Sequence, residues 1–331
     1  MKNHTNCSRC RSAGIVLVST LALLTSVQNG PALTIIRDFI GGAPGTNDIG
    51  SGNVVEIFNA AADIWELAIR DQHVLTLHFG WAPVGGGEHT LIAQGGTPNR
   101  ETEGTILFNN DNSPIHYHYY LDPTPYDNEE FGNYMEETIN LGGGPVNATR
   151  VFKSGPASFD LLTTALHEIG HALGMSTANT TFIAESADLD IDVTAPRPFA
   201  GTTIPLQSNM YGVTSHIDYV AGRILMAGSY APGERGLPSV LDIIALAQLC
   251  QFSALNVNLV PTLDITALGA NVTVRWPQPL VEFMVEQNTD LRQTNAWSTV
   301  EFPVVMSNGL HTVRLPVTTG KNFFRLRKRG S

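Results

Sequence analysis

The chain has 331 residues, of which 43% are hydrophobic and 15% charged, and its formal net charge is −11. This balance excludes a largely disordered chain, and the excess of acidic residues argues against binding to nucleic acid or anionic membranes through charge. The three cysteines are too few for a disulfide-rich scaffold, and the length allows two domains.

Residues 1–30 have the pattern of an export signal. An apolar run over Gly14–Val27, too short for a stable membrane span, follows three basic residues: Lys2, Arg9 and Arg11. Removal of this segment takes the net charge from −11 to −14. We expect a secreted, extracellular or periplasmic protein without stable membrane insertion after processing; the alternative is an uncleaved N-terminal anchor.

Residues 31–255 are expected to form the first domain. Apolar residues at helical spacing predict a helix over Asn59–Ile69. Alternation of apolar and polar residues predicts strands over Val74–Trp81 and Gly104–Asn109, and Gly85–Gly87 marks a loop between them.

Two groups of residues of the types that bind metals occur within residues 31–255. His116 and His118 suggest a second metal site, but alternating strand residues in a core or cleft wall explain them more simply. On a strand, Asp188, Asp190 and Asp192 would line one face and offer oxygens to Ca²⁺. A solvated surface is the simpler interpretation of these three carboxylates.

The run His167–Met175 reads His-Glu-Ile-Gly-His-Ala-Leu-Gly-Met. Apolar residues at helical spacing predict a helix that begins after Ser158 or Asp160 and stops at Gly174.

On such a helix, His167 and His171 share one face and can bind one Zn²⁺ through a nitrogen each. Glu168 lies where a general base can reach a metal-bound water. The motif therefore indicates a catalytic zinc site; the alternative is a chance match on a buried helix. A catalytic zinc needs a third protein ligand.

Residues 150–252 resemble the metzincin zinc peptidases, most closely the leishmanolysin-like branch. The usual metzincin position for the third ligand is Thr177, which is a poor zinc ligand. The leishmanolysin-like branch instead has an insertion, then a histidine, a Leu-Met-Ala turn and a final helix. Here His216, Leu225–Ala227 and Leu241–Leu249 match that order.

The resemblance gives each candidate site residue an expected role. His167, His171 and His216 are expected to be the ligands of a single catalytic zinc, and Glu168 is expected to be the general base. Gly174 would be the turn glycine and Met226 the turn methionine. The alternative for His216 is a surface loop histidine. The chain departs from this disulfide-rich branch, since only Cys250 remains beyond the export signal.

The resemblance also implies an α+β fold. We expect a metzincin-like catalytic domain of two subdomains with an active-site helix and a cleft between them. The edge strand above that cleft would pair with an extended peptide.

Residues 262–331 have a different pattern. Short alternating segments with Gly, Pro, Asn and Asp between them predict a small all-β sandwich. The segment is similar to C-terminal β modules of exported bacterial proteins, which favours a bacterial source.

Together these features predict an exported zinc-dependent metalloendopeptidase acting on protein or peptide substrates, with no nucleic-acid partner. Two other functions stay open. One is a non-catalytic surface or adhesion protein stabilised by the metal, and the other is a zinc amidase acting on cell-wall material.

Overall fold

The computed structural model describes residues 32–228, 230–277, 283–307, 310–316 and 321–328. The predicted export signal, residues 1–30, lies outside the described residues. Within the described ranges, no helix is both long enough and apolar enough to cross a membrane.

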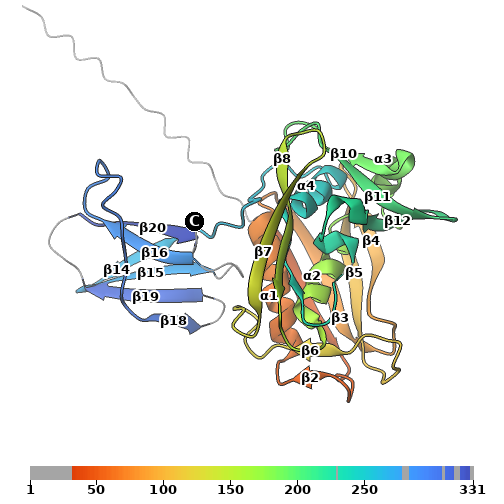
Figure 1. The fold of residues 1–331 in the computed structure, drawn as a ribbon, viewed down its shortest axis with the longest axis horizontal. Coiled ribbons are helices and arrows are strands. Elements are labelled where there is room, and N and C mark those ends of the chain that lie inside the picture. The colour runs from red at the N-terminus through yellow and green to blue at the C-terminus, as the bar shows by residue number, and fades with distance from the viewer. Residues whose placement is uncertain (1–31, 229, 278–282, 308–309, 317–320, 329–331) are drawn as a thin grey trace, which may run out of the picture. The chain divides into compact units, whose positions relative to one another are not determined.

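A four-stranded sheet in the order β1-β3-β5-β4 forms the first layer of the larger part of the chain (Figure 1). Its strands, in chain order, are β1 (Leu33–Gly41), β3 (His73–Ala82), β4 (Gly87–Gly95) and β5 (Arg100–Asn109). β1, β3 and β5 are parallel, whereas β4 pairs antiparallel with β5 and forms an edge. An edge strand leaves one row of backbone N–H and C=O groups available for pairing.

Helices α1 (Val54–Ala68) and α2 (Leu161–Ala172) pack against each other and against this sheet. The ring of Phe58 on α1 stacks on that of Phe79 on β3, with centroids 3.9 Å apart. Trp65 on α1 donates its indole N–H to the carbonyl of Leu166 on α2 at 2.9 Å. The two helices are therefore joined by a buried hydrogen bond as well as by apolar packing.

Further strands form three small sheets in the same part of the chain. Their orders are β13-β8-β7, β10-β11-β12 and β2-β6-β9. The strand bounds are β2 (Ile49–Gly50), β6 (Tyr119–Leu121), β7 (Gly132–Asn140), β8 (Pro145–Lys153), β9 (Phe159–Asp160), β10 (Asp190–Asp192), β11 (Thr203–Asn209), β12 (Gly212–Ile217) and β13 (Arg235–Gly236).

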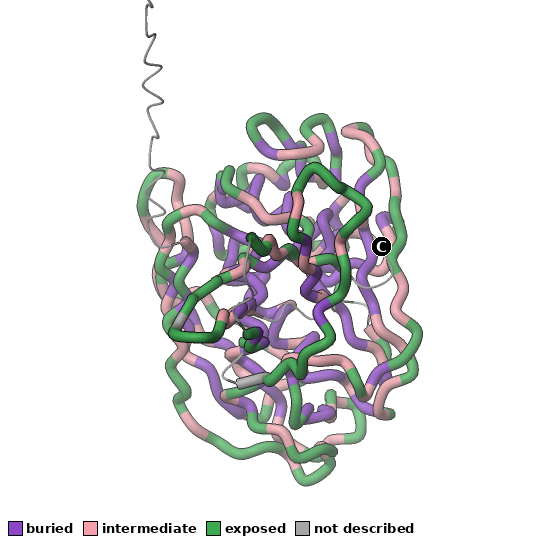
Figure 2. The backbone as a smooth tube through the Cα atoms, turned by 90° about the vertical axis from the view of Figure 1, so that its left-hand side faces the viewer, coloured by how far each residue is buried: buried purple, intermediate pink, exposed green. Residues whose placement is uncertain are grey.

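The remaining helical elements follow α2 in the chain. They are α3 (Thr180–Glu185), α4 (Val240–Leu249) and the 3₁₀ turns η1 (Ser186–Asp188), η2 (Tyr219–Ala221) and η3 (Leu225–Ala227). Helix α4 is buried along its whole length and contacts β8. Along the described chain, buried stretches lie mostly towards the inside of the drawing in Figure 2, and exposed stretches form much of its outline.

The C-terminal segment contains two antiparallel sheets, in the orders β14-β15-β19-β18 and β17-β16-β20. Their strands are β14 (Asp264–Leu268), β15 (Asn271–Pro277), β16 (Phe283–Asn288), β17 (Ser298–Thr299), β18 (Val304–Ser307), β19 (Leu310–Pro316) and β20 (Phe323–Lys328). Both sheets contribute to a small core that includes Trp276, Val285 and Val313. The described elements of this segment are all strands, while the predicted sandwich and the domain boundaries at 255 and 262 stay predictions.

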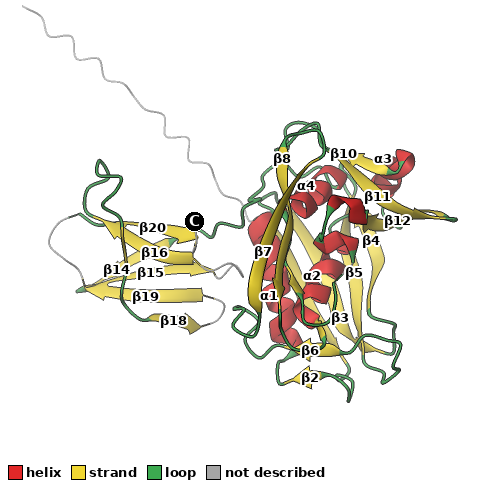
Figure 3. Ribbon diagram, viewed as in Figure 1, coloured by secondary structure: helices red, strands yellow, loops and turns green. Residues whose placement is uncertain are grey.

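The expected α+β, metzincin-like catalytic domain of two subdomains is wrong. Of the described residues, 41% are in strands and 19% in helices, and the strands form six sheets (Figure 3). The sequence pattern underestimates the strand content, because a strand such as β7 shows no clean alternation of apolar and polar residues. β7, for example, is exposed or half-buried along its whole length.

Candidate metal centre

Helix α2 carries the main motif. Asp160 is its N-cap and accepts a hydrogen bond from the Thr163 amide at 3.0 Å, so the predicted alternative start at Ser158 is wrong. The last helical residue is Ala172, and Gly174 has φ +125°, a conformation in which a side chain would be strained. The chain therefore turns away from the helix axis directly after the second histidine.

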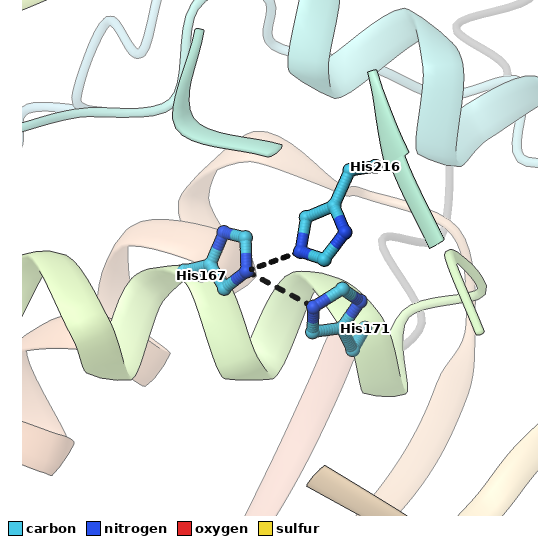
Figure 4. A group of neighbouring side chains, drawn as sticks. All are labelled: His167, His171 and His216. Carbon is cyan, nitrogen blue, oxygen red and sulfur yellow. Dashed lines mark hydrogen bonds between the residues drawn. The ribbon is translucent and has the colours of Figure 1, made fainter. Parts of the chain in front are cut away.

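The structure brings His167, His171 and His216 together (Figure 4). The first two lie one turn apart on α2, and His216 comes from strand β12. The Nε2 atom of His167 lies 3.0 Å from that of His171 and 3.3 Å from that of His216. Three imidazoles from two separate elements thus direct the same nitrogen to one point.

The other ring nitrogens show which tautomer is present. Nδ1 of His167 lies 2.8 Å from the carbonyl oxygen of Leu225, and Nδ1 of His171 lies 2.6 Å from that of Met175. A carbonyl oxygen only accepts, so both Nδ1 atoms carry the proton and a neutral ring has a lone pair at Nε2. Two lone pairs facing each other at 3.0 Å repel unless a cation lies between them.

Burial keeps these rings neutral. It is the first cause that lowers the pKa of each histidine, to about 4 for His167, where the nearby His216 ring lowers it further. The pKa values of His171 and His216 are also lowered, first by burial. Neutral imidazole is the form that binds zinc.

The nitrogen positions fit a tetrahedral zinc. With Zn–N bonds of about 2.0–2.1 Å, two ligand nitrogens lie about 3.3–3.4 Å apart. The observed separations of 3.0 and 3.3 Å are close to that edge length. Hydrogen bonds from the outer nitrogens to carbonyls, as in His167 and His171, are also typical of zinc-bound histidines.

Glu168 lies beside this centre and is buried, with 6% of its surface exposed. Burial raises the pKa of its carboxyl to about 8; Glu88 raises it further, and a hydrogen bond from the His89 amide opposes the shift. The start of strand β4 makes room for it, because a Cβ on Gly87 would overlap with the Glu168 side chain. Glycine is therefore needed where this edge strand passes the carboxylate.

The raised pKa of Glu168 gives a test on the metal-free protein. A buried acid with a raised pKa contributes stability that is present below its unfolded-state pKa, near 4.5, and lost as the pH rises through about 8. Glutamine does not titrate, so metal-free Glu168→Gln should become progressively more stable than metal-free wild type between these values. Each pKa unit corresponds to about 1.4 kcal/mol, so the free energy of unfolding of the variant should exceed that of wild type by several kcal/mol. Urea unfolding measures this difference. A gap that stays constant with pH would contradict this environment for Glu168.

Met226 lies beneath α2 in the turn η3 and is fully buried. Gly170 on α2 faces it, since a Cβ there would overlap with the Met226 sulfur. Asp242 on α4 holds this turn by accepting from the Met226 amide at 2.8 Å and the Leu225 amide at 3.3 Å. The same turn supplies the carbonyl that orients His167, so Asp242 acts on the centre through the backbone.

An open cavity of about 770 Å³ lies over the three histidines and Glu168. It is lined by the start of β4, by one face of α2, by β12 and by residues after η3, including Tyr230 and Glu234. Thr177 also lines it, and its amide donates to the Ser215 hydroxyl at 2.9 Å. A substrate of several residues has space to reach the centre.

The other predicted metal-binding groups have less support. Asp188, Asp190 and Asp192 lie close together, but Asp188 belongs to η1, so the three do not share one strand face as expected. Exposed acidic groups of this kind are common without an ion. His116 and His118 precede β6 instead of alternating along a strand; His116 binds Asp111 at 2.7 Å and His118 the Ser113 carbonyl at 3.0 Å.

Sequence reasoning missed several residues around the centre. Ser239-Val-Leu-Asp242 is a capping box at the start of α4, a pattern that would have marked Asp242 as a helix-start residue. His89 on β4 and Glu101 on β5 form a buried pair in the cavity wall. The sequence pattern predicts a loop over Gly85–Gly87 and no strand after it, whereas β4 begins at Gly87.

Comparison with known proteins yields no matching family, no similar characterised protein and no similar solved structure.

Proposed function

We propose that this protein is an exported zinc-dependent metalloendopeptidase. One observation carries the proposal: three histidine nitrogens converge inside an open cavity, with the buried Glu168 carboxylate next to them. A purely structural zinc site is normally closed by four ligands and needs no neighbouring base. Here the described ligand set stops at three and opens onto the cavity.

Each residue then has a distinct role. His167, His171 and His216 would hold zinc, which when bound lowers the pKa of water and polarises a carbonyl group. Glu168 accepts the proton of the attacking water and delivers it to the leaving nitrogen, and its raised pKa suits a group that must both accept and donate near neutral pH. Strand β4 offers its free edge to hold an extended peptide backbone.

The test compares zinc content and casein cleavage in wild type and Glu168→Ala. Wild type should bind about one zinc and cleave casein, and the variant should keep the zinc while its turnover falls by about 10²–10⁴-fold. Glu103→Gln, which changes a half-exposed carboxylate on β5, is the matched control and should behave as wild type.

Other results would favour the alternative functions. Zinc-loaded wild type that cleaves no protein offered would support the adhesion function, and release of peptidoglycan fragments without casein cleavage would support an amidase. A Glu168→Ala variant that cleaves casein at the wild-type rate would refute the assigned base.

A further inference from the structure

His89 and Glu101 form a buried pair beside the three histidines. His89 lies on the edge strand β4 and Glu101 on its neighbour β5, with side chains 3% and 0% exposed. Nε2 of His89 lies 2.7 Å from Oε1 of Glu101. Gly104 leaves space for this contact, because a Cβ there would overlap with that carboxylate oxygen.

His89 is the group that balances the charge of Glu101. The pKa of Glu101 is raised by burial, against the effect of the hydrogen bond to His89. His73 also approaches Glu101, but it bonds the backbone carbonyl, at 2.7 Å. An unbalanced carboxylate at 0% exposure would be costly. The favoured protonation states are therefore those in which the His89–Glu101 pair as a whole has no net charge.

In these neutral states the second ring nitrogen, Nδ1, carries a proton. If the proton is on the histidine, both ring nitrogens are donors. If the carboxyl holds it on Oε1, Nε2 accepts from that oxygen and the neutral ring is protonated at Nδ1. A proton on Oε2 is disfavoured, because this buried oxygen has no hydrogen-bond partner.

His89, which carries this Nδ1–H, is a lining residue of the same cavity as the metal centre, with its side chain 3% exposed. The His89 ring is tilted by only 20° from that of His171, with centroids 6.4 Å apart. No described group accepts a hydrogen bond from its Nδ1, since the one hydrogen bond of the ring is that between Nε2 and Glu101. The residue thus lines the cavity of the metal centre and has a donor without a partner among the described groups.

We propose that His89 is a further catalytic residue of this site, whose Nδ1–H donates a hydrogen bond to the substrate carbonyl oxygen as negative charge develops on it. Glu101 is the positioning residue that fixes the ring. This inference rests on the proposed peptidase function. A preorganised donor on such an oxygen typically contributes about 10²–10³-fold in turnover.

The decisive variant is His89→Gln. The glutamine amide can replace Nε2 and keep Glu101 paired, but it has no donor at the position of Nδ1. We expect kcat on a fluorogenic peptide to fall about 10²–10³-fold with KM within about threefold of wild type, since the contact forms only in the transition state. His73→Gln changes a histidine that also touches Glu101, through its backbone, and should keep wild-type kinetics.

A second measurement separates this role from a structural one. The zinc content of His89→Gln should match wild type, while its affinity for a phosphinic peptide, which mimics the charged tetrahedral oxygen, should fall in parallel with kcat/KM. Loss of zinc, or an increase in KM alone, would overturn the proposal.

The two proposals can fail separately. If zinc-loaded wild type neither cleaves peptides nor binds the phosphinic peptide, the peptidase function fails. If wild type does both and His89→Gln does them equally well, only the role of His89 fails.

Discussion

Replacing His216 with alanine is expected to weaken zinc binding by more than 100-fold and to abolish casein cleavage. Losing an outer-shell partner typically costs 10–100-fold in metal affinity, and losing one of three direct ligands should cost more. The two remaining histidines sit on one helix and leave one side of the centre open. Competition with a chromogenic chelator measures the zinc affinity directly.

His116→Ala is the control for this experiment, because that histidine pairs with Asp111 outside the triad. It should bind zinc as wild type does. Tight zinc binding together with cleavage in His216→Ala would mean that another group supplies the third ligand, and the assignment of His216 would have to be abandoned.

Replacing Arg235 with methionine should destabilise the protein by about 3–5 kcal/mol, the typical cost of removing one partner from a buried ion pair. The Arg235 side chain is fully buried; it binds Asp160 through Nε at 3.0 Å and Nη2 at 2.8 Å, and it also bonds Asp122. Its guanidinium lies 4.3 Å from the centre of the Phe131 ring. Methionine would fill much of the space but leave both carboxylates without a cation.

Urea unfolding of the metal-free protein measures this effect. Arg292→Met is the control, since its ion pair with Asp290 involves an arginine side chain that is 90% exposed, and a change of about 0–1 kcal/mol is expected. An Arg235→Met variant as stable as wild type would show that the pair is not needed for stability. Because Asp160 also caps α2, the unfolding midpoint reports on the helix that carries the motif.

The local elements around the candidate site were predictable from the sequence because their signals are short-range. The helix predicted over Asn59–Ile69 is confirmed as part of α1, and the strands at Val74–Trp81 and Gly104–Asn109 are confirmed within β3 and β5. Helix α2 and its stop at Gly174 follow from helical spacing and one glycine. These patterns depend only on neighbouring residues.

The overall fold was not predictable in the same way. Strand β8 owes its burial to contacts with α4, about 90 residues later in the chain, and its sequence Pro-Val-Asn-Ala-Thr-Arg-Val-Phe-Lys shows no alternation. Arg150 within it is buried and donates to the Pro238 carbonyl at 2.9 Å. Pairings of this range leave little trace in a local pattern, and the helical motif therefore received too much weight.

The geometry of the three-histidine centre was likewise predictable only in its local part. The spacing of His167 and His171 predicts that they share a helix face, whereas the 44 residues between His171 and His216 carry no distance information. The structure nevertheless brings His216 on β12 to these two histidines, with its Nε2 atom 3.3 Å from that of His167. The Asp242 contacts that hold η3 required the tertiary structure.

Asp242 ties the alignment of the three-histidine centre to a part of the chain that is synthesised late. It caps its own helix and fixes η3, and η3 in turn orients a histidine that lies 75 positions earlier in the chain. A nascent chain that ends before Asp242 therefore contains the three histidines but lacks the support that aligns them. Alignment of the three-histidine centre therefore waits until the chain has been made as far as Asp242.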